Sequence, residues 1–344
     1  MKDYIERTYL SAGEVAAYLG IAVKDVHGLA RDNTLKSCKS ASGQYRFALS
    51  EVKKAKVKKN HEPPPRKIER ESEVHIRETI QRMYLGDSRV MRELRENTMH
   101  LAVTSPPYFN AKMYSQDSEN DLGNIHDLDA WLVETGKTWR EVFRVLQPGR
   151  KFFLNIMNLP VRENNSFRSL NLVGKSIELC EGIGFIFKRD IVWHKTNGVR
   201  AHFGTYPYPG GILLNNMHEF ILEFDKPAKS GIRKYAHVSE ADREESRLSK
   251  EFWLSVKNSD VWTMKPEKSG DHRLHVAPFP LELPMRLIRS YSFVGEHILD
   301  PFCGSGTTLI AASLAKRNGV GYELNEDFLA HAVDRLRREE SKLL

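Results

Sequence analysis

The sequence lacks any apolar run near the ~18 residues that a membrane-spanning helix needs, which excludes an integral membrane protein. The opening residues, MKDYIERTYL, also lack the apolar core of a secretory signal, so we expect a protein of the cytoplasm. Cysteine is scarce: Cys38, Cys180 and Cys303 lie far apart and form no metal-binding spacing. The cysteines therefore argue against a disulfide framework and indicate no metal site.

What the sequence does have is an uneven charge. Its 344 residues are 40% hydrophobic and 28% charged, which is typical of a globular chain with two domains or one large one. The formal net charge is +7, and residues 1–70 hold fifteen Lys and Arg against eight Asp and Glu, so this stretch carries the whole excess. Such a stretch indicates a polyanionic partner, most simply nucleic acid, although a solubilising tail has the same composition.

Residues 1–50 have the pattern of a small separate domain. The S-x-x-E sequence from Ser11 predicts a helix start, Gly20 ends that helix, and a second helix is expected over Val23–Arg31. Two short strands are then expected around a Ser42-Gly43 turn. This layout resembles the excisionase type of winged helix-turn-helix, which implies DNA binding through the second helix. A structural or protein-binding appendage remains the alternative.

A linker over residues 51–67, with five lysines and then three prolines, separates this unit from the rest. From residue 68 to 344, short apolar strands alternate with helical stretches, which predicts an α/β sheet. The expected strands are Arg82–Leu85, Leu101–Thr104, Lys151–Asn155, Ile186–Trp193, Phe220–Phe224, Glu296–Asp300 and Val320–Glu323. The expected helices are Leu128–Leu146, Leu170–Glu181, Leu281–Ser292, Thr307–Ala315 and Glu326–Arg338.

A glycine loop, residues 301–307, follows the strand that ends in Asp300 and precedes a helix. Gly304 and Gly306 allow positive φ and a close approach of ligand to backbone, and the amides at the helix start are donors. The loop fits neither the dinucleotide fingerprint nor the Walker loop. Glu323 ends the next strand, 23 residues after Asp300, where a carboxylate can bind ribose hydroxyls.

A second motif, the tetrapeptide Ser105-Pro106-Pro107-Tyr108, follows another apolar strand. The two prolines fix φ and remove two backbone donors, so the carbonyl oxygens are exposed as acceptors. Together with the Ser105 hydroxyl, these acceptors suit an exocyclic amino group, which donates two hydrogens. The Tyr108 ring offers a flat surface on which a base can stack.

The two motifs together resemble those of the amino-group DNA methyltransferases, over about residues 82–338. The resemblance implies a Rossmann-like α/β sheet, S-adenosylmethionine (AdoMet) as cofactor and double-stranded DNA as substrate. The tetrapeptide corresponds to motif IV and the glycine loop to motif I. Their order along the chain implies the β class, which has a circularly permuted sheet. Serine at position 105 implies transfer to the N4 amino group of cytosine.

The same resemblance assigns roles to individual residues. Asp87, in YLGDS, is expected near the adenine of AdoMet, and Pro278 and Phe279, in VAPFPLELP, near its methionine end. Residues 199–260 are expected to form the target-recognition region. The catalytic residues are then Ser105, Pro106, Pro107 and Tyr108. The cofactor-binding residues are Asp87, Pro278, Phe279, Asp300, Phe302, Gly304, Ser305, Gly306, Thr307 and Glu323. Cys303, inside the loop, is interpreted as a packing residue.

Several alternatives stay open at this point. The nearest is an adenine-N6 DNA methyltransferase. Related enzymes with similar motifs act on protein glutamine or on RNA, and a DNA-binding regulator with an inactive methyltransferase domain would also keep the fold. The resemblance further implies a prokaryotic restriction-modification system with a cognate restriction endonuclease. The sequence leaves the choice between monomer and homodimer open.

Overall fold

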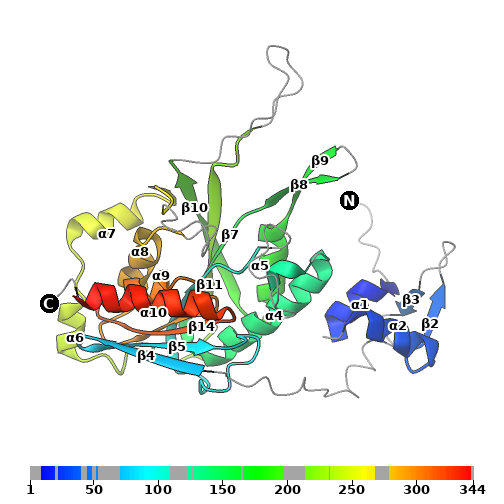
Figure 1. Cartoon of the computed structure of the whole chain (residues 1–344), viewed down its shortest axis with the longest axis horizontal. Helices are drawn as coiled ribbons and strands as arrows, with labels where there is room; N and C mark the ends of the chain where they lie inside the picture. Colours follow the sequence, from blue (N-terminus) through cyan, green and yellow to red (C-terminus); the bar gives the residue numbers. More distant parts are fainter. Residues whose placement is uncertain are drawn as a thin grey trace, which may run out of the picture.

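The structure, a computed structural model, describes residues 9–19, 22–39, 45–48, 52, 70–108, 122–125, 127–163, 166–196, 214–231, 233–267 and 279–341. These residues form a small amino-terminal unit and a large α/β unit (Figure 1). Among the helices so described, none combines the length and apolar character needed to cross a membrane. The expected linker, residues 51–67, lies outside the described residues except for Val52.

The amino-terminal unit contains two helices and a three-stranded sheet with the order β1-β3-β2. Its elements are β1 (Tyr9–Ser11), α1 (Ala12–Leu19), α2 (Val23–Arg31), β2 (Ser37–Lys39) and β3 (Tyr45–Ala48). It has its own apolar cluster, in which Val15, Val26, Leu35, Phe47 and Val52 are buried. Both helices lie where the sequence predicts them, whereas β1 was not expected. The Ser42-Gly43 turn falls outside the described residues.

The central sheet of the large unit has nine strands among the described residues, in the order β12-β10-β11-β7-β6-β13-β14-β5-β4. In chain order they are β4 (Arg70–Ile76), β5 (Thr79–Leu85), β6 (Met99–Thr104), β7 (Leu146–Ile156), β10 (Ile186–Lys195), β11 (His218–Asp225), β12 (Val261–Met264), β13 (His297–Asp300) and β14 (Asn318–Glu323). β4 and β11 run antiparallel to the other strands. The five strands β7, β6, β13, β14 and β5 are all parallel, as expected for an α/β fold.

Helices cover both faces of this sheet. Consecutive residues of a strand point to opposite faces, so one strand can contribute to the apolar clusters on both sides. On β7, Phe152 belongs to the cluster under α4 (Leu128–Val145) and α5 (Leu172–Ile183). Its neighbour Phe153 belongs to the cluster under α8 (Glu282–Tyr291) and α9 (Thr307–Leu314). The carboxy-terminal helix α10 (Glu326–Ser341) packs beside α9 and β4. The expected α/β fold is therefore confirmed.

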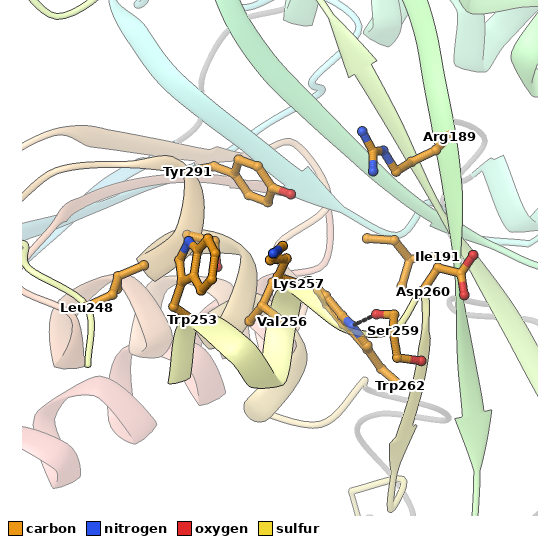
Figure 2. Close-up of a pocket in the computed structure, with 11 residues that line it drawn as sticks. Arg189, Ile191, Leu248, Trp253, Val256, Lys257, Ser259, Asp260, Trp262 and Tyr291 are labelled. Atoms are coloured by element: carbon orange, nitrogen blue, oxygen red, sulfur yellow. Dashed lines mark hydrogen bonds between the residues drawn. The ribbon is translucent and has the colours of Figure 1, made fainter. Parts of the chain in front are cut away.

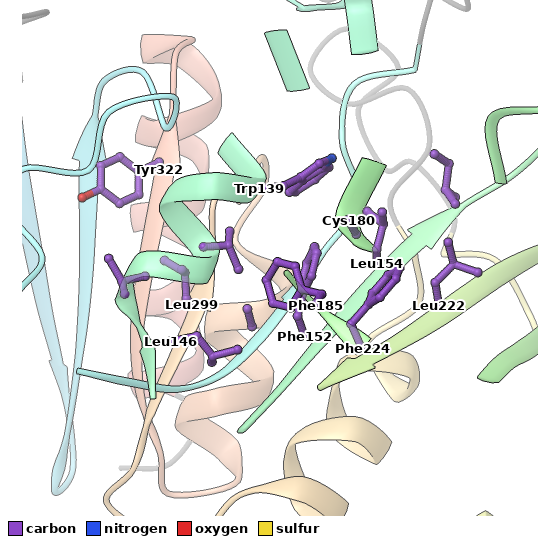
Figure 3. Packing of buried hydrophobic residues seen from close by; sticks show 14 of the residues in the cluster. Trp139, Leu146, Phe152, Leu154, Cys180, Phe185, Leu222, Phe224, Leu299 and Tyr322 are labelled. Atoms are coloured by element: carbon purple, nitrogen blue, oxygen red, sulfur yellow. The ribbon is translucent and has the colours of Figure 1, made fainter. Parts of the chain in front are cut away.

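The first of these clusters is rich in aromatic side chains (Figure 3). Phe152 lies between Trp139 and Phe224, with ring centroids 5.2 and 5.7 Å away. On α4, Trp131, Thr135, Trp139 and Val142 are buried at helical spacing, so one face of the helix lies on the sheet. Burial of each such large side chain stabilises the fold by about 1.5–3 kcal/mol.

The remaining elements lie at the edges. A hairpin of β8 (Leu159–Glu163) and β9 (Ser166–Leu170) extends from the end of β7 (Figure 1). Two short helices, α6 (Glu240–Glu245) and α7 (Lys250–Lys257), precede β12. A 3-10 turn, η1 (Leu122–Asn124), precedes α4. Helix α1 of the amino-terminal unit contacts α4.

Candidate active site

Four neighbouring parallel strands end at the same edge of the sheet, and each carries part of the predicted site. β6 leads into the tetrapeptide, β13 into the glycine loop, β14 ends in Glu323, and β5 is followed by Asp87. Because β6 pairs with β13, the two motifs start side by side although about 200 residues separate them in sequence. This edge is where α/β sheets bind ligands.

Asp300 joins the two motifs directly. Its Oδ1 accepts a hydrogen bond from the Thr104 hydroxyl at 2.6 Å, and its Oδ2 accepts one from the Thr308 hydroxyl at 2.6 Å. The backbone N–H of Phe302 donates to Oδ1 at 3.1 Å. The side chain is buried, and burial raises the pKa of Asp300 from 3.8 to about 6, although these hydrogen bonds lower it. Asp300 therefore fixes the end of β6 relative to the glycine loop.

The backbone of the glycine loop adopts left-handed conformations, as expected. Gly304 has φ +51° and Gly306, which precedes α9, has φ +78°. The N–H of Gly304 donates to Oε2 of Glu323 at 3.0 Å, and the N–H of Cys303 donates to the carbonyl of Tyr322 at 2.9 Å. The loop is thus held against the end of β14. Burial raises the pKa of the Cys303 thiol, which agrees with a packing residue.

Arg335 on α10 holds the same loop from the other side. Its guanidinium donates to the Ser305 carbonyl at 2.9 Å, to the Ser305 hydroxyl at 2.8 Å and to the Thr307 hydroxyl at 3.1 Å. It also pairs with Glu267 at 3.2 Å. Sequence reasoning missed Arg335, because nothing in the sequence of α10 marks it as a contact of the loop.

In the tetrapeptide, two of the four residues have their polar groups engaged by the fold. The Pro107 carbonyl accepts from the indole N–H of Trp131 at 3.1 Å, and the Tyr108 hydroxyl donates to Oε2 of Glu219 at 2.9 Å. Within the described part of the chain, no donor bonds to the Ser105 hydroxyl or to the Pro106 carbonyl. Ser105 is half-buried. Two acceptors are therefore available at the end of β6.

Helix α4 is linked to three parts of this site: the tetrapeptide, the glycine loop and the Asp87 ion pair. Besides the Trp131 contact, the Trp139 ring meets the Phe302 ring of the glycine loop edge-on, with centroids 5.8 Å apart. Asp87 lies at the end of β5 and forms an ion pair with Arg89 at 2.7 Å, and Arg89 in turn contacts Glu134 of α4. The sequence predicts the helix but not these roles of its side chains.

Other predicted site residues are described only in part. Pro278 lies outside the described residues, and the neighbouring Phe279 packs against the cluster under α8 and α9. Of the expected target-recognition region, residues 199–260, the stretch up to 213 also lies outside the described part. Within the described remainder, β11 is an internal strand of the sheet.

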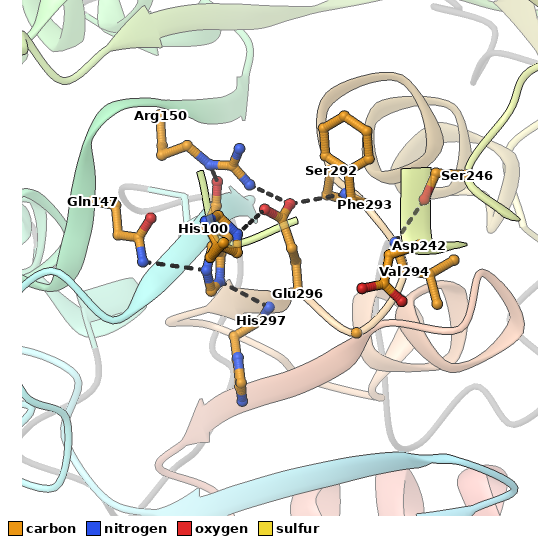
Figure 4. A network of polar contacts seen from close by, with 12 residues as sticks. His100, Gln147, Arg150, Asp242, Ser246, Ser292, Phe293, Val294, Glu296 and His297 are labelled. Carbon is orange, nitrogen blue, oxygen red and sulfur yellow. Dashed lines mark hydrogen bonds and ion pairs between the residues drawn. The ribbon is translucent and has the colours of Figure 1, made fainter. Parts of the chain in front are cut away.

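A polar network lies at the opposite end of these strands, where β6 and β13 begin (Figure 4). His100, His237 and Glu296 are close enough to share a metal ion. Glu296, however, pairs with Arg150, and Nδ1 of His100 accepts the backbone N–H of His297 at 3.0 Å. Nε2 of His100 lies 3.2 Å from the amide nitrogen of Gln147. Burial and Arg150 lower the pKa of His100 to about 3, so its ring is neutral. Because Glu296 and both ring nitrogens of His100 already have protein partners, we interpret the network as structural.

A cavity of about 350 Å³ lies between β10, α7, β12 and α8 (Figure 2). Trp253, Trp262 and Tyr291 contribute aromatic surface to it, and Arg189 and Lys257 contribute charge. None of the predicted catalytic or cofactor-binding residues lines this cavity. It is therefore separate from the edge that carries the two motifs.

The raised pKa of Asp300 predicts a pH-dependent contribution to stability. The folded state takes up a proton near pH 6 that the unfolded chain takes up only near pH 3.8. The resulting stabilisation is present below the lower value and is lost as the pH rises through about 6. Between about pH 4 and about pH 8, the unfolding free energy of the wild type should therefore fall by about 3 kcal/mol relative to that of Asp300→Asn, which has no such proton to lose. Urea unfolding of both proteins measures this, and a pH-independent difference would contradict it.

Comparison with known families places both motifs within a single family match. Residues 99–334 match the N6_N4_Mtase family model, described as DNA methylase, and this match contains both motifs. Residues 9–55 match a helix-turn-helix domain. The amino-terminal unit, which the sequence predicts to be of this kind, is thereby confirmed as a helix-turn-helix domain.

Individual relatives agree with this family. The type II methyltransferase M.MthZI of Methanothermobacter thermautotrophicus is 32% identical, over 73% of this chain and 74% of its own. M.MjaI of Methanocaldococcus jannaschii is 32% identical, over 72% and 88%. TTHA0409 of Thermus thermophilus, a candidate DNA modification methylase crystallised with S-adenosyl-L-methionine, superposes with a TM-score of 0.60 at 35% identity, over 75% and 94%. The chain therefore belongs to the N6/N4 DNA methylase family.

Proposed function

We propose that this chain transfers the methyl group of AdoMet to the N4 amino group of a cytosine that has been flipped out of duplex DNA. The observation that carries the proposal is the pair of acceptors at the end of β6, the Ser105 hydroxyl and the Pro106 carbonyl, beside the glycine loop. An exocyclic amino group has two hydrogens to donate, which these acceptors match. Serine at position 105, rather than aspartate, favours cytosine over adenine.

The residues around the glycine loop fit AdoMet. Its ribose hydroxyls suit the Glu323 carboxylate, and its methionine part suits the backbone donors of the loop. When bound, AdoMet supplies an electrophilic methyl group on a sulfonium. We assign to its binding Asp87, Pro278, Phe279, Asp300, Phe302, Gly304, Ser305, Gly306, Thr307 and Glu323. Asp300 contributes through the shape of the loop, because Thr104, Thr308 and Phe302 donate to its carboxylate.

The chemistry asked of the chain is mainly positioning. Extrusion of the base costs a few kcal/mol, which stacking on Tyr108 and hydrogen bonds in the site offset. Ser105 and Pro106 accept the amino hydrogens and so orient the nitrogen lone pair. Holding two reacting groups in line supplies most of the rate in such a transfer. No covalent bond between the enzyme and the base is required.

The helix-turn-helix domain gives the chain a second DNA-facing surface in this proposal. Lys24, His27 and Arg31 are exposed along α2 and lie three or four residues apart, on one side of the helix. Such side chains suit contacts with phosphates or with base edges in the major groove. We place the domain boundaries at 1–50, 51–67 and 68–344, with target recognition in 199–260.

We also assign the enzyme to the β class. The strand of the tetrapeptide, β6, precedes the strand of the glycine loop, β13, by about 200 residues, and yet the two are neighbours in the sheet. This order is the permuted arrangement expected for that class. Since its relatives are type II methyltransferases, we propose that the chain is the modification enzyme of a restriction-modification system and works beside a cognate endonuclease.

Nucleoside mass spectrometry tests the assignment. The chain is expressed in a bacterium that lacks DNA methylation, and the genomic DNA is digested to nucleosides. We expect N4-methylcytosine, which sequencing then places in one recognition context. N6-methyladenine instead would establish the adenine alternative. Absence of any methylated base, with no transfer of labelled methyl to DNA in vitro, would favour a DNA-binding regulator with an inactive domain.

A further inference from the structure

A buried carboxylate that belongs to neither motif contacts the tetrapeptide. Glu219, near the start of β11, is 6% exposed. Its Oε2 accepts hydrogen bonds from the Tyr108 hydroxyl at 2.9 Å and from the Asn155 amide at 2.5 Å. Its Oε1 pairs with the Lys195 ammonium at 2.5 Å. One carboxylate thus receives three donors.

These donors come from different parts of the fold. Asn155 lies on β7 and Lys195 on β10, the two strands that flank β11, whereas Tyr108 follows β6. The Tyr108 ring also packs against the cluster under α4 and α5, so apolar contacts hold the ring and Glu219 holds its hydroxyl. Two such constraints restrict the position of the ring.

Burial of a carboxylate is costly unless it is paired and hydrogen-bonded, and here its partners balance that cost. An apolar side chain would fill the same volume without this cost. Ile221, two residues further along β11, is such a side chain and belongs to the apolar cluster under α8 and α9. Glu223 on the same strand is also a buried, paired carboxylate, so burial alone does not set Glu219 apart. What distinguishes Glu219 is its contact with the Tyr108 hydroxyl, which indicates a role in the site.

We propose that Glu219 is a positioning residue that holds the Tyr108 ring in the orientation required for stacking on the target base, with Lys195 and Asn155 holding Glu219. The proposal rests on the proposed function, because it takes the flipped base as the group that Tyr108 meets. Glu219 itself touches neither the base nor the methyl donor. Its effect reaches the reaction through the Tyr108 hydroxyl.

Three variants test this assignment: Glu219→Gln, Tyr108→Phe and the double variant. The amide of the first variant keeps the shape of the carboxylate but offers one oxygen to three donors, and the phenyl ring of the second variant keeps the stacking surface but has no hydroxyl. We expect each single variant to lower the single-turnover rate of methyl transfer by roughly 10- to 100-fold, the range for a charge-assisted hydrogen bond. The double variant should be no slower than the slower single variant, because both remove the same contact.

Glu223→Gln is the matched control. Glu223 lies four residues further along β11, is 2% exposed and pairs with Lys151, so it is an equally buried ion pair away from Tyr108. We expect similar shifts of thermal stability for Glu223→Gln and Glu219→Gln, but loss of methyl-transfer rate only for the latter. The KM values for DNA and AdoMet should stay near those of the wild type in the Glu219 variant.

Three results would overturn the assignment: a wild-type rate in Glu219→Gln, an equal loss of rate in Glu223→Gln, or multiplicative losses in the double variant. Each of these outcomes is independent of which base is methylated, since that is decided by the modified nucleoside in wild-type reactions. If that product is N6-methyladenine while the Glu219 and Tyr108 effects remain coupled, the cytosine assignment fails and the positioning role stands.

Discussion

Gly306→Asp is expected to abolish AdoMet binding. Gly306 has φ +78°, a conformation that costs an L-residue about 1 kcal/mol or more. A Cβ there would also lie 3.0 Å from the Cβ of Ala332 on α10, so the loop or the helix has to shift. In addition, the new carboxylate is at the start of α9, beside the backbone donors that we assign to the cofactor. Equilibrium dialysis with labelled AdoMet measures the loss, which we expect to exceed 100-fold in affinity, about 3 kcal/mol.

Gly295→Asp separates the loss of binding from general backbone strain. Gly295 has almost the same backbone angle, φ +76°, but nothing lies within 4 Å of a Cβ at that position. It precedes β13, at the end of the sheet opposite the glycine loop. We therefore expect this variant to lose some stability and to bind AdoMet normally. If Gly306→Asp binds AdoMet as the wild type does, the cofactor site lies elsewhere in the chain.

The elements that the sequence predicts best are the buried parallel strands and the helices next to them. β6 and β14 are completely or largely buried, and their predicted bounds are within two residues of the observed ones. α2 is predicted to the residue, because its helical pattern is bounded by turn residues. In these cases the local sequence pattern and the tertiary environment favour the same secondary structure.

The elements that sequence reasoning missed lie at edges. β4, the last strand of the sheet, carries Arg70, Glu71 and Glu73 and exposes most of its side chains, so it has no apolar run to recognise. β12, at the other edge, has four residues. Edge strands are commonly short and charged, which prevents pairing with other chains. The sequences of these strands are therefore charged, as in β4, or short, as in β12, and lack a hydrophobic pattern long enough to predict a strand.

The residues of the candidate site also fall into two groups, those that the sequence predicts and those that it does not. Motif residues such as Ser105 and Gly304 are found from sequence, because their chemistry depends on neighbours in the chain. The residues that support them act across the fold: Trp131 meets Pro107 24 positions away, and Glu219 meets Tyr108 111 positions away. Such contacts are set by which strands become neighbours, and a single sequence contains no local signal for that.

Ser105→Ala is expected to lower methyl transfer strongly while leaving cofactor binding unchanged. The Ser105 hydroxyl has no donor within the described residues, and in the proposed mechanism it accepts a hydrogen of the target amine. Loss of one preorganised hydrogen-bonding group in an active site typically costs about 100-fold or more in rate. Tyr108→Ala should lower the rate by a similar factor, because base–aromatic stacking contributes about 1–3 kcal/mol.

Single-turnover methylation and AdoMet dialysis on the same protein samples distinguish catalysis from binding. AdoMet affinity should change less than about threefold in both variants, because Glu323 and the glycine loop are untouched. Ser105→Asp is the informative companion, since it restores an acceptor at the first position of the tetrapeptide and should retain more activity than Ser105→Ala. Near-normal turnover in both Ser105→Ala and Tyr108→Ala would refute the role of the tetrapeptide, because the proposed mechanism depends on the Ser105 acceptor and on the Tyr108 ring.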